Sequence, residues 1–316
     1  MDINVKSVSK TRLLIEGEIP ASTFESYRKA AGRHLGEHME LPGFRKGHIP
    51  ENVLVDKLGP MAILEQMAEM AIRDEYPKIL VENEIAAVGR PEVSITKIAA
   101  DNPLSFKITQ DVLPEFKLPD YREIARKVNA EQEKVKTKIE VTSEELENIL
   151  VEIKKTNPDE ELDDEKKNRV KENLVREKEL RAKDKHRIAL IEAILKDTAI
   201  DVPDVLVERQ MDRFIDEMRV NLSRMQVNFE EYLKKSGKTE EAIREASRED
   251  ANKRVRTQLL LEALAKEEKI ELDEQELERE TSHILDHYKN ADREAARDYV
   301  AGVMRNTRVF DILEKL

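Results

Sequence analysis

Apolar residues recur at intervals of three and four through the carboxy-terminal half of the chain, from about residue 166 to the end. This spacing places them on one face of an α-helix. Charged residues make up 39% of the 316 residues and aromatic residues only 4%, and there is no Trp. Such a composition suits long solvated helices better than a single deep core. We expect an elongated all-α domain here, with helices at residues 166–196, from 203 onward, and at 228–236, 239–268, 272–289 and 293–316.

The first 110 residues or so show a different pattern. Leu13, Ile15, Gly17 and Ile19 alternate with polar residues, which is typical of a strand with one buried face. Helical spacing follows, and two further strand-like runs come after it. The order ββ, helices, ββ predicts an α+β domain with a sheet on one side and helices on the other. We expect strands at residues 3–8, 12–19, 91–97 and 104–109, and helices at 21–39, 51–58 and 63–81.

A proline-bounded segment, from Leu113 to Pro119, leaves this domain. Apolar residues are sparse in residues 121–140, so we expect an ordered and mostly extended linker there. Thr142 and Glu145 have the spacing of a capping box and predict a helix start. These boundaries predict three parts, at residues 1–115, 116–158 and 159–316.

One short loop, residues 41–50, lies between two predicted helices. Gly43 and Gly47 free its backbone, and prolines fix φ at its ends. The expected tip presents Phe44 beside the cations Arg45 and Lys46. An exposed aromatic in a basic loop suits a partner surface rich in phosphate or carboxylate. The alternative is an ordinary turn whose aromatic ring folds back onto its own helices.

The run Gly43-Phe44-Arg45-Lys46-Gly47-x-x-Pro50 closely resembles the ribosome-docking loop of trigger factor, the bacterial chaperone that meets nascent chains at the exit tunnel. The resemblance extends to about residue 117 and, more diffusely, from about residue 163 to the end. It implies that this loop contacts the large-subunit protein and rRNA beside the tunnel exit. It also implies helical arms around a cradle. The sequence leaves open whether the free protein is a homodimer. The docking residues so implied are Gly43, Phe44, Arg45, Lys46, Gly47 and Pro50.

Longer members of that family carry a prolyl-isomerase domain of the FK506-binding type after the helix equivalent to the one predicted at 142–155. In this sequence Pro158 leads straight into an acidic run and then a long charged helix. An isomerase pocket needs a strand-built, aromatic-lined cavity of its own. We therefore expect the isomerase domain to be absent and the chain not to be an enzyme.

Methionines at helical spacing, in the stripe from Val207 to Met225, allow two interpretations. They can be plain core, or they can form a partly exposed apolar wall whose flexible side chains adapt to unrelated ligands. A chaperone that holds unfolded polypeptides needs the second arrangement. The residues predicted to contact such substrates are Met211, Phe214, Met218, Met225, Tyr299, Val303 and Phe310.

Other chemistries find little support. There is no Cys, and only 9 Gly, without a phosphate-binding loop. The pairs His34/His38 and His283/His287 have the i, i+4 spacing of metal ligands but lack a third ligand nearby in sequence. A net charge of −12 argues against bulk nucleic-acid binding, and no run of about 18 apolar residues indicates a membrane span.

The sequence thus predicts a cytoplasmic, ATP-independent chaperone that uses no cofactor and no metal. It would dock at the ribosomal exit tunnel and shield nascent polypeptides. Two alternatives remain open: a peptidyl-prolyl isomerase and a ribosome-independent holdase.

Overall fold

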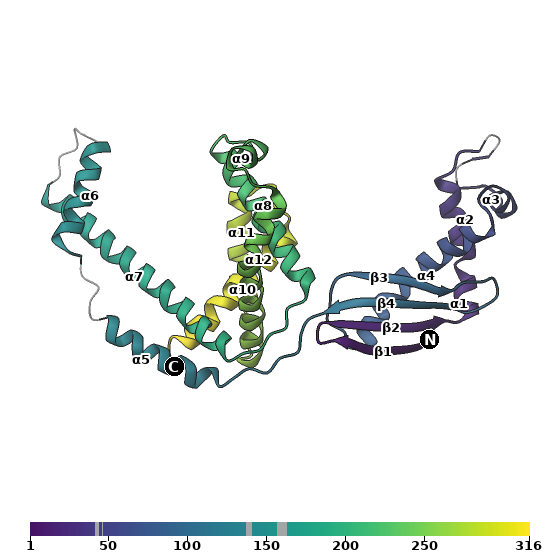
Figure 1. Ribbon diagram of the computed structural model, residues 1–316, viewed down its shortest axis with the longest axis horizontal. Coiled ribbons are helices and arrows are strands. Elements are labelled where there is room, and N and C mark those ends of the chain that lie inside the picture. Colours follow the sequence, from purple (N-terminus) through teal and green to yellow (C-terminus); the bar gives the residue numbers. More distant parts are fainter. Residues whose placement is uncertain (42–43, 46, 137–140, 157–162) are drawn as a thin grey trace. The chain divides into compact units, whose positions relative to one another are not determined.

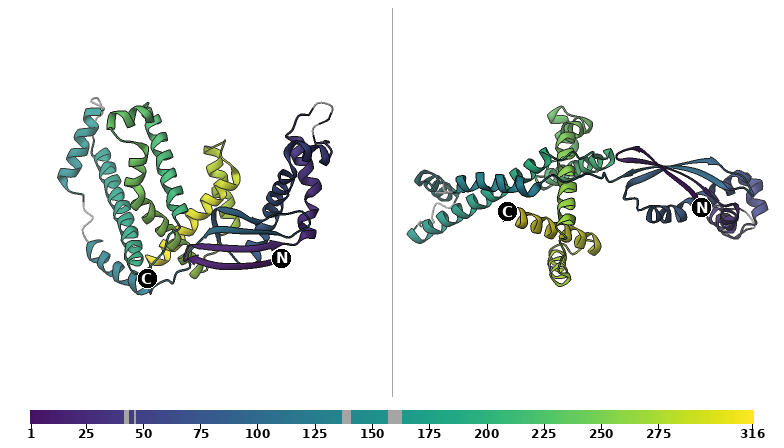
Figure 2. Two further views of the ribbon diagram at one scale, coloured as in Figure 1. Left: turned by 45° about the vertical axis from the view of Figure 1, so that its right-hand side comes forward. Right: turned by 90° about the horizontal axis from the view of Figure 1, so that it is seen from below.

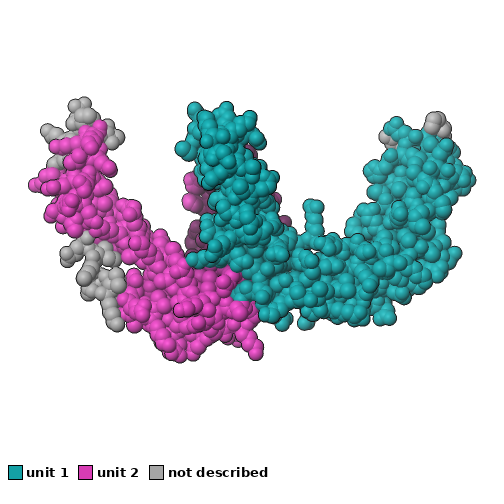
Figure 3. Space-filling view, viewed as in Figure 1, with its two compact units in different colours: residues 1–115, 200–255 teal, residues 116–199, 256–316 magenta. Residues whose placement is uncertain are grey.

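The computed structural model describes residues 1–41, 44–45, 47–136, 141–156 and 163–316. The described chain is mostly helical, with one antiparallel sheet in its amino-terminal part and helices thereafter (Figure 1). It divides into two compact units, coloured separately in Figure 3. Unit 1 contains residues 1–115 and 200–255, and unit 2 contains residues 116–199 and 256–316. The three sequence-continuous domains predicted above stay a prediction.

The sheet has four antiparallel strands in the order β1-β2-β4-β3, so β1 and β3 form its edges (Figure 2). Along β2, Ile15, Gly17 and Ile19 are buried, whereas Glu18 is exposed, as alternation predicts for a strand with one covered face. The four predicted strands are confirmed, with β3 beginning earlier than expected. Their bounds are β1 (Asp2–Ser9), β2 (Arg12–Ile19), β3 (Ala87–Lys97) and β4 (Leu104–Val112).

Four helices follow β2 and supply the other half of the amino-terminal core: α1 (Ala21–Ser26), α2 (Arg28–Glu37), α3 (Glu51–Leu58) and α4 (Pro60–Glu82). Phe24 of α1, Met67 of α4 and Phe106 of β4 meet in this core and are at most 2% exposed. The single helix predicted at 21–39 is divided at Tyr27, whose N–H donates to the Phe24 carbonyl at 3.1 Å. That short i−3 bond tightens the chain between α1 and α2.

The linker predicted to be extended is instead a helix, α5 (Tyr121–Lys136); residues 137–140 of that prediction lie outside the described chain. Tyr121 and Ala125 are buried, and α5 packs along α7 (Asp164–Lys196). Asn129 donates to the Leu313 carbonyl at 2.9 Å and lies 2.8 Å from the His186 ring. Polar contacts with distant residues therefore hold a helix whose apolar content alone looked too sparse.

The other described elements of unit 2 are also helices. Thr142 and Glu145 form the predicted capping box, each side chain accepting a hydrogen bond from the other residue's N–H. Asp163 caps α7 and Asp292 caps the last helix. The remaining helices are α6 (Ser143–Thr156), α11 (Glu274–His287) and α12 (Arg293–Leu313), with the end of α10 (Glu240–Glu267).

Unit 1 also includes α8 (Asp204–Arg224), α9 (Phe229–Ser236) and most of α10. Lys10 pairs with Asp201 at 2.8 Å, just before α8. Gly89, at φ +77°, lies so close to Val205 that a β-carbon there would be 2.9 Å from a valine methyl group. These contacts join the start of α8 to the sheet. None of the described helices combines the length and apolar content needed to cross a membrane.

Two glycine substitutions test this packing. A β-carbon on Gly17 would lie 2.7 Å from Cζ of Phe106, whereas one on Gly302 in α12 would meet nothing within 4 Å. We expect Gly17→Ala to lower the free energy of unfolding by about 1–3 kcal/mol through overpacking. We expect Gly302→Ala to raise it by about 0.5–1 kcal/mol through helix propensity. Denaturant unfolding followed by circular dichroism measures both, and equal effects would contradict the packing described.

Candidate functional site

The loop between α2 and α3 is closed by a backbone contact between two glycines. The Gly47 N–H donates to the Gly36 carbonyl at 2.9 Å. Gly47 has φ +75°, and a β-carbon there would come within 3.0 Å of the Glu37 side chain. Ile49 is buried and anchors the returning segment in the amino-terminal core. The loop is therefore fixed at its base.

Phe44 stands at the described tip of this loop and is 42% exposed. Arg45 beside it is exposed as well and forms no ion pair with the described part of the chain. The His48 N–H donates to the Arg45 carbonyl at 3.0 Å, which holds the backbone behind the arginine. The predicted docking residues Gly43 and Lys46 lie outside the described residues. The exposed ring and guanidinium thus form a small amphipathic tip.

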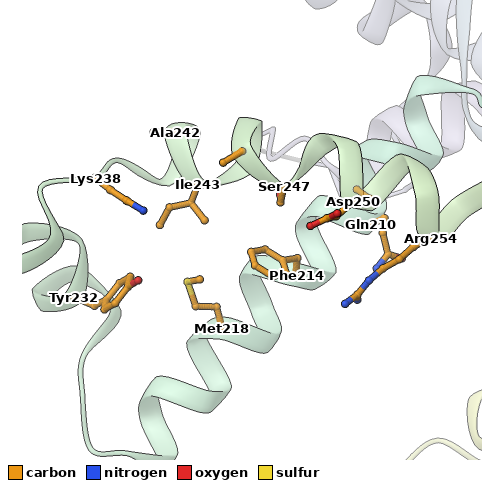
Figure 4. A pocket seen from close by; sticks show the side chains of 12 residues that line it. Gln210, Phe214, Met218, Tyr232, Lys238, Ala242, Ile243, Ser247, Asp250 and Arg254 are labelled. Atoms are coloured by element: carbon orange, nitrogen blue, oxygen red, sulfur yellow. The ribbon is translucent and has the colours of Figure 1, made fainter. Parts of the chain in front are cut away.

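A groove of about 400 Å³ lies between α8 and α10 in unit 1 and is bounded at one end by α9. Figure 4 shows Phe214 and Met218 of α8 facing Ile243 and Ser247 of α10. Tyr232 reaches it from α9. Its lining is mainly apolar, and charged groups stand at its borders. The border residues with polar side chains are Gln210, Lys238, Asp250 and Arg254.

Ion pairs connect the outer sides of the same helices. Arg244 of α10 pairs with Asp212 of α8 at 2.6 Å, and Arg248 pairs with Glu208 at 2.7 Å. The Arg244 guanidinium donates a hydrogen bond to the Asp212 carboxylate, and this bond raises the pKa of Arg244. Near α9, the Arg219 guanidinium lies 4.9 Å from the centre of the Phe229 ring. The helices are thus joined by polar contacts while the groove between them stays open.

The methionines in the stripe of α8 do not all fit one interpretation, because one is a core residue and two are at least partly exposed. Met211 is 1% exposed and packs with Val207 and Ala251, so it is a core residue and not a surface for substrates. Met218 is half-buried and lines the groove. Met225 ends α8 and is 72% exposed. The stripe is divided because α10 covers only its first turns closely.

Three further predicted substrate contacts belong to α12. Tyr299 and Val303 are one turn apart and are 65% and 47% exposed. The opposite side of the helix packs on α11 through Val300 and Ala301. Phe310 is half-buried, with the Arg187 guanidinium 4.9 Å from its ring centre. Tyr299 and Val303 form a small exposed apolar pair, whereas the half-buried Phe310 ring already contacts Arg187 within unit 2.

The two histidine pairs are close but incomplete as metal sites. Ring centres are 4.8 Å apart for His34 and His38, and 5.1 Å apart for His283 and His287. In the described chain, no group of three or more His, Cys, Asp or Glu side chains could hold a metal ion.

Comparison with protein families decides the identity of this fold. A family model described as bacterial trigger factor protein matches residues 1–153, and one described as its C-terminus matches residues 162–313. The chain belongs to the trigger factor family.

Curated trigger factors are similar along most of their length. The trigger factor of Caldicellulosiruptor bescii is 24% identical over 388 aligned positions, covering 91% of this chain and 89% of the relative. That of Bacillus subtilis is 25% identical over 373 positions, covering 86% and 88%. A solved structure of the trigger factor chaperone, described for promiscuous substrate recognition in folding and assembly, aligns with a TM-score of 0.57 and 18% identity. It covers 100% of this chain and 99% of its own, so the fold is shared.

Sequence reasoning missed part of the groove in this trigger factor family member. Tyr232 and Ile243 line it, although neither belongs to the α8 stripe. Tyr232 lies on α9, the short helix predicted at 228–236, which Asn228 and Gly237 cap. The signal that could have indicated Tyr232 as a groove residue is its position, an aromatic side chain on a short helix between two long amphipathic helices.

Groove variants should bind apolar probes more weakly. Phe214→Asp or Met218→Asp places a charge in the groove at a half-buried position. We expect about tenfold weaker binding of a permanently unfolded polypeptide, measured by fluorescence anisotropy. Val220→Asp is the matched control, because Val220 lies on α8 outside the groove lining and is 51% exposed. Equal losses in all three variants would show that added charge acts generally, not through the groove.

Proposed function

We propose that this chain is an ATP-independent chaperone that docks on the large ribosomal subunit beside the exit tunnel and shields nascent polypeptides. One observation carries the proposal: Phe44 is 42% exposed, whereas Phe24 and Phe106 of the same domain are 1% and 2% exposed. Fully burying a phenylalanine side chain contributes about 1.5–3 kcal/mol, and the 42% exposure of Phe44 forgoes a part of this free energy. A partner surface that covers the ring recovers this free energy.

The tip suits a mixed surface of protein and RNA. Its aromatic ring can enter an apolar pocket or stack on a base. Arg45 can pair with a phosphate or carboxylate group in a bidentate manner. The chain as a whole carries a net charge of −12, so attraction to RNA has to be local. A local attraction favours an oriented contact through the loop. It does not favour nonspecific binding of the whole molecule to RNA.

Substrate holding would use several weak apolar sites. In this proposal the groove between α8 and α10 takes apolar side chains of an unfolded segment, and Tyr299 with Val303 adds a second contact. Each patch is small and bordered by charge, which keeps the free protein from aggregating. Linked weak contacts on one chain raise the overall affinity without a nucleotide cycle. The helical arms implied by the family resemblance would correspond to the hairpins that carry these two sites.

Removing the docking tip tests the first half of the proposal. We expect the triple variant Phe44→Ala, Arg45→Ala, Lys46→Ala to bind ribosomes at least about tenfold more weakly in co-sedimentation, since it loses the ring and both cations. A matched control removes one exposed apolar residue and two cations from β3: Val93→Ala, Arg90→Ala, Lys97→Ala. Unchanged ribosome binding by the loop variant would favour a ribosome-independent holdase.

The isomerase alternative is weakened by where the family models lie. They leave only residues 154–161 between them. The alignment with the Caldicellulosiruptor bescii protein has 388 positions but includes about 288 residues of this chain (91%), so about 100 positions of the relative have no counterpart here. All described strands lie before residue 113. We also propose that no isomerase domain is inserted between the two family regions of this chain, and that the protein acts in the cytoplasm.

An isomerase assay separates these functions. We expect no catalysis of cis/trans isomerisation in a proline-containing tetrapeptide, followed without a coupling protease. The reaction should keep its uncatalysed time constant of tens of seconds or longer. The same preparation should delay aggregation of a denatured protein without ATP. Acceleration well above the uncatalysed rate would establish an enzymatic activity and contradict the proposed absence of an isomerase site.

A further inference from the structure

A second groove, of about 520 Å³, lies at the base of the loop that carries Phe44. It is formed by the first turns of α2 and α3, which lie side by side in Figure 1. Gly47 and Ile49, which hold the base of the loop, also line this groove, so the loop and the groove are continuous. Among the described residues that line it, three are cations and one is an acid. These charged residues are Arg28, Lys29, Arg33 and Glu51.

The acid of the groove is already paired. Arg28 donates to the Glu51 carboxylate at 3.0 Å and also to Glu25, which lies outside the lining. These bonds connect the start of α2 to the start of α3, the first helix after the loop. Within the groove, the charges of Arg28 and Glu51 therefore offset each other, and the other two cations determine the local charge.

Lys29 and Arg33 remain available to a ligand. They are one turn apart on the same face of α2, and both are exposed. Lys29 forms no ion pair with the described part of the chain. Arg33 lies 3.8 Å from Glu37, with the two side chains 72% and 53% exposed. An ion pair this long and exposed contributes little, so Arg33 can exchange it for a phosphate.

Small residues keep the groove open beside these cations. Ala30 and Gly32 line it, and a β-carbon on Gly32 would meet nothing within 4 Å. Glycine inside a helix costs about 0.5–1 kcal/mol relative to alanine. The open space next to the two cations lets a sugar–phosphate backbone come close to α2.

We propose that this groove binds the phosphate backbone of ribosomal RNA, with Lys29 and Arg33 each contacting a phosphate. The inference rests on the proposed docking through Phe44 and Arg45. RNA is the partner that the charges favour, because two available cations beside the exposed guanidinium of the loop suit a ligand with closely spaced anions. Phosphate contacts position a protein without reading sequence. The groove would thus orient the amino-terminal domain, while the aromatic ring supplies the apolar contact.

Removing both cations tests the proposal through the salt dependence of ribosome binding. Losing one phosphate contact lowers the slope of log K against log salt by about 0.7–0.9. For Lys29→Gln with Arg33→Gln, we expect a slope smaller by about 1.5 in co-sedimentation between about 50 and 200 mM salt. Arg90→Gln with Lys97→Gln removes the same charge from β3 and should leave the slope unchanged. Equal slopes for the two double variants would overturn the proposal.

An acid placed inside the groove gives a second test. Gly32→Glu and Gly32→Gln introduce side chains of equal size into open space, and only the first is charged. We expect Gly32→Glu to bind ribosomes about tenfold more weakly than Gly32→Gln, because its carboxylate repels phosphate. Circular dichroism melting confirms that both variants are folded. Equal binding by the two would contradict an anionic ligand in the groove.

Crosslinking distinguishes RNA from an acidic ribosomal protein. The chain has no Cys, so Ser26→Cys gives a single thiol at the border of the groove for a benzophenone label. On the ribosome this label should crosslink to large-subunit RNA, and crosslinks to protein alone would overturn the proposal.

The triple variant of the loop separates this inference from the proposed docking. If the loop variant loses ribosome binding while Lys29→Gln with Arg33→Gln keeps the full affinity and slope, the groove proposal fails and the docking proposal stands. If both variants bind like the unmodified chain, both proposals fail.

Discussion

The hydrogen bond between the Gly47 N–H and the Gly36 carbonyl closes the base of the loop that carries Phe44. It joins the far side of the loop to the end of α2 at a point where a side chain on Gly47 would press on Glu37. Ile49 then returns the chain to the core. Phe44 lies within the loop closed in this way and is 42% exposed, unlike the buried Phe24 and Phe106 of the same domain. A ring exposed above a closed loop base is accessible to a partner surface.

In the helical part of unit 1, polar contacts likewise connect two elements while apolar side chains between them are not fully buried. Arg244 and Arg248 tie α10 to α8 along one side, while Phe214 and Met218 stay half-buried in the groove between the helices. Ordinary packing would close such a groove to bury those side chains. Exposed apolar area of this kind is tolerable because it is narrow and bordered by charge. The surface that results suits brief contact with many sequences.

Local signals in the sequence predicted most of the fold, because caps and alternation act over a few residues. The Thr142–Glu145 box, the Asn228 and Gly237 caps and the alternation in β2 are such signals. Helix α5 was missed because its anchors, the Leu313 carbonyl and His186, are far along the chain. The periodicity placed Met211 and Met218 on one stripe, but could not tell that α10 covers the first and not the second. Burial of that kind depends on packing partners that no single-segment pattern contains.

The chain enters unit 1, leaves it after residue 115, returns at residue 200 and leaves again after residue 255. The amino-terminal sheet and its helices have a core of their own, whereas α8 to α10 join that unit only when about four-fifths of the polypeptide has been synthesised. During translation, the loop that we propose to dock is therefore complete well before the groove exists. A truncated product ending near residue 199 would carry the proposed docking loop without the groove between α8 and α10. It would compete with intact molecules for the same proposed site on the ribosome.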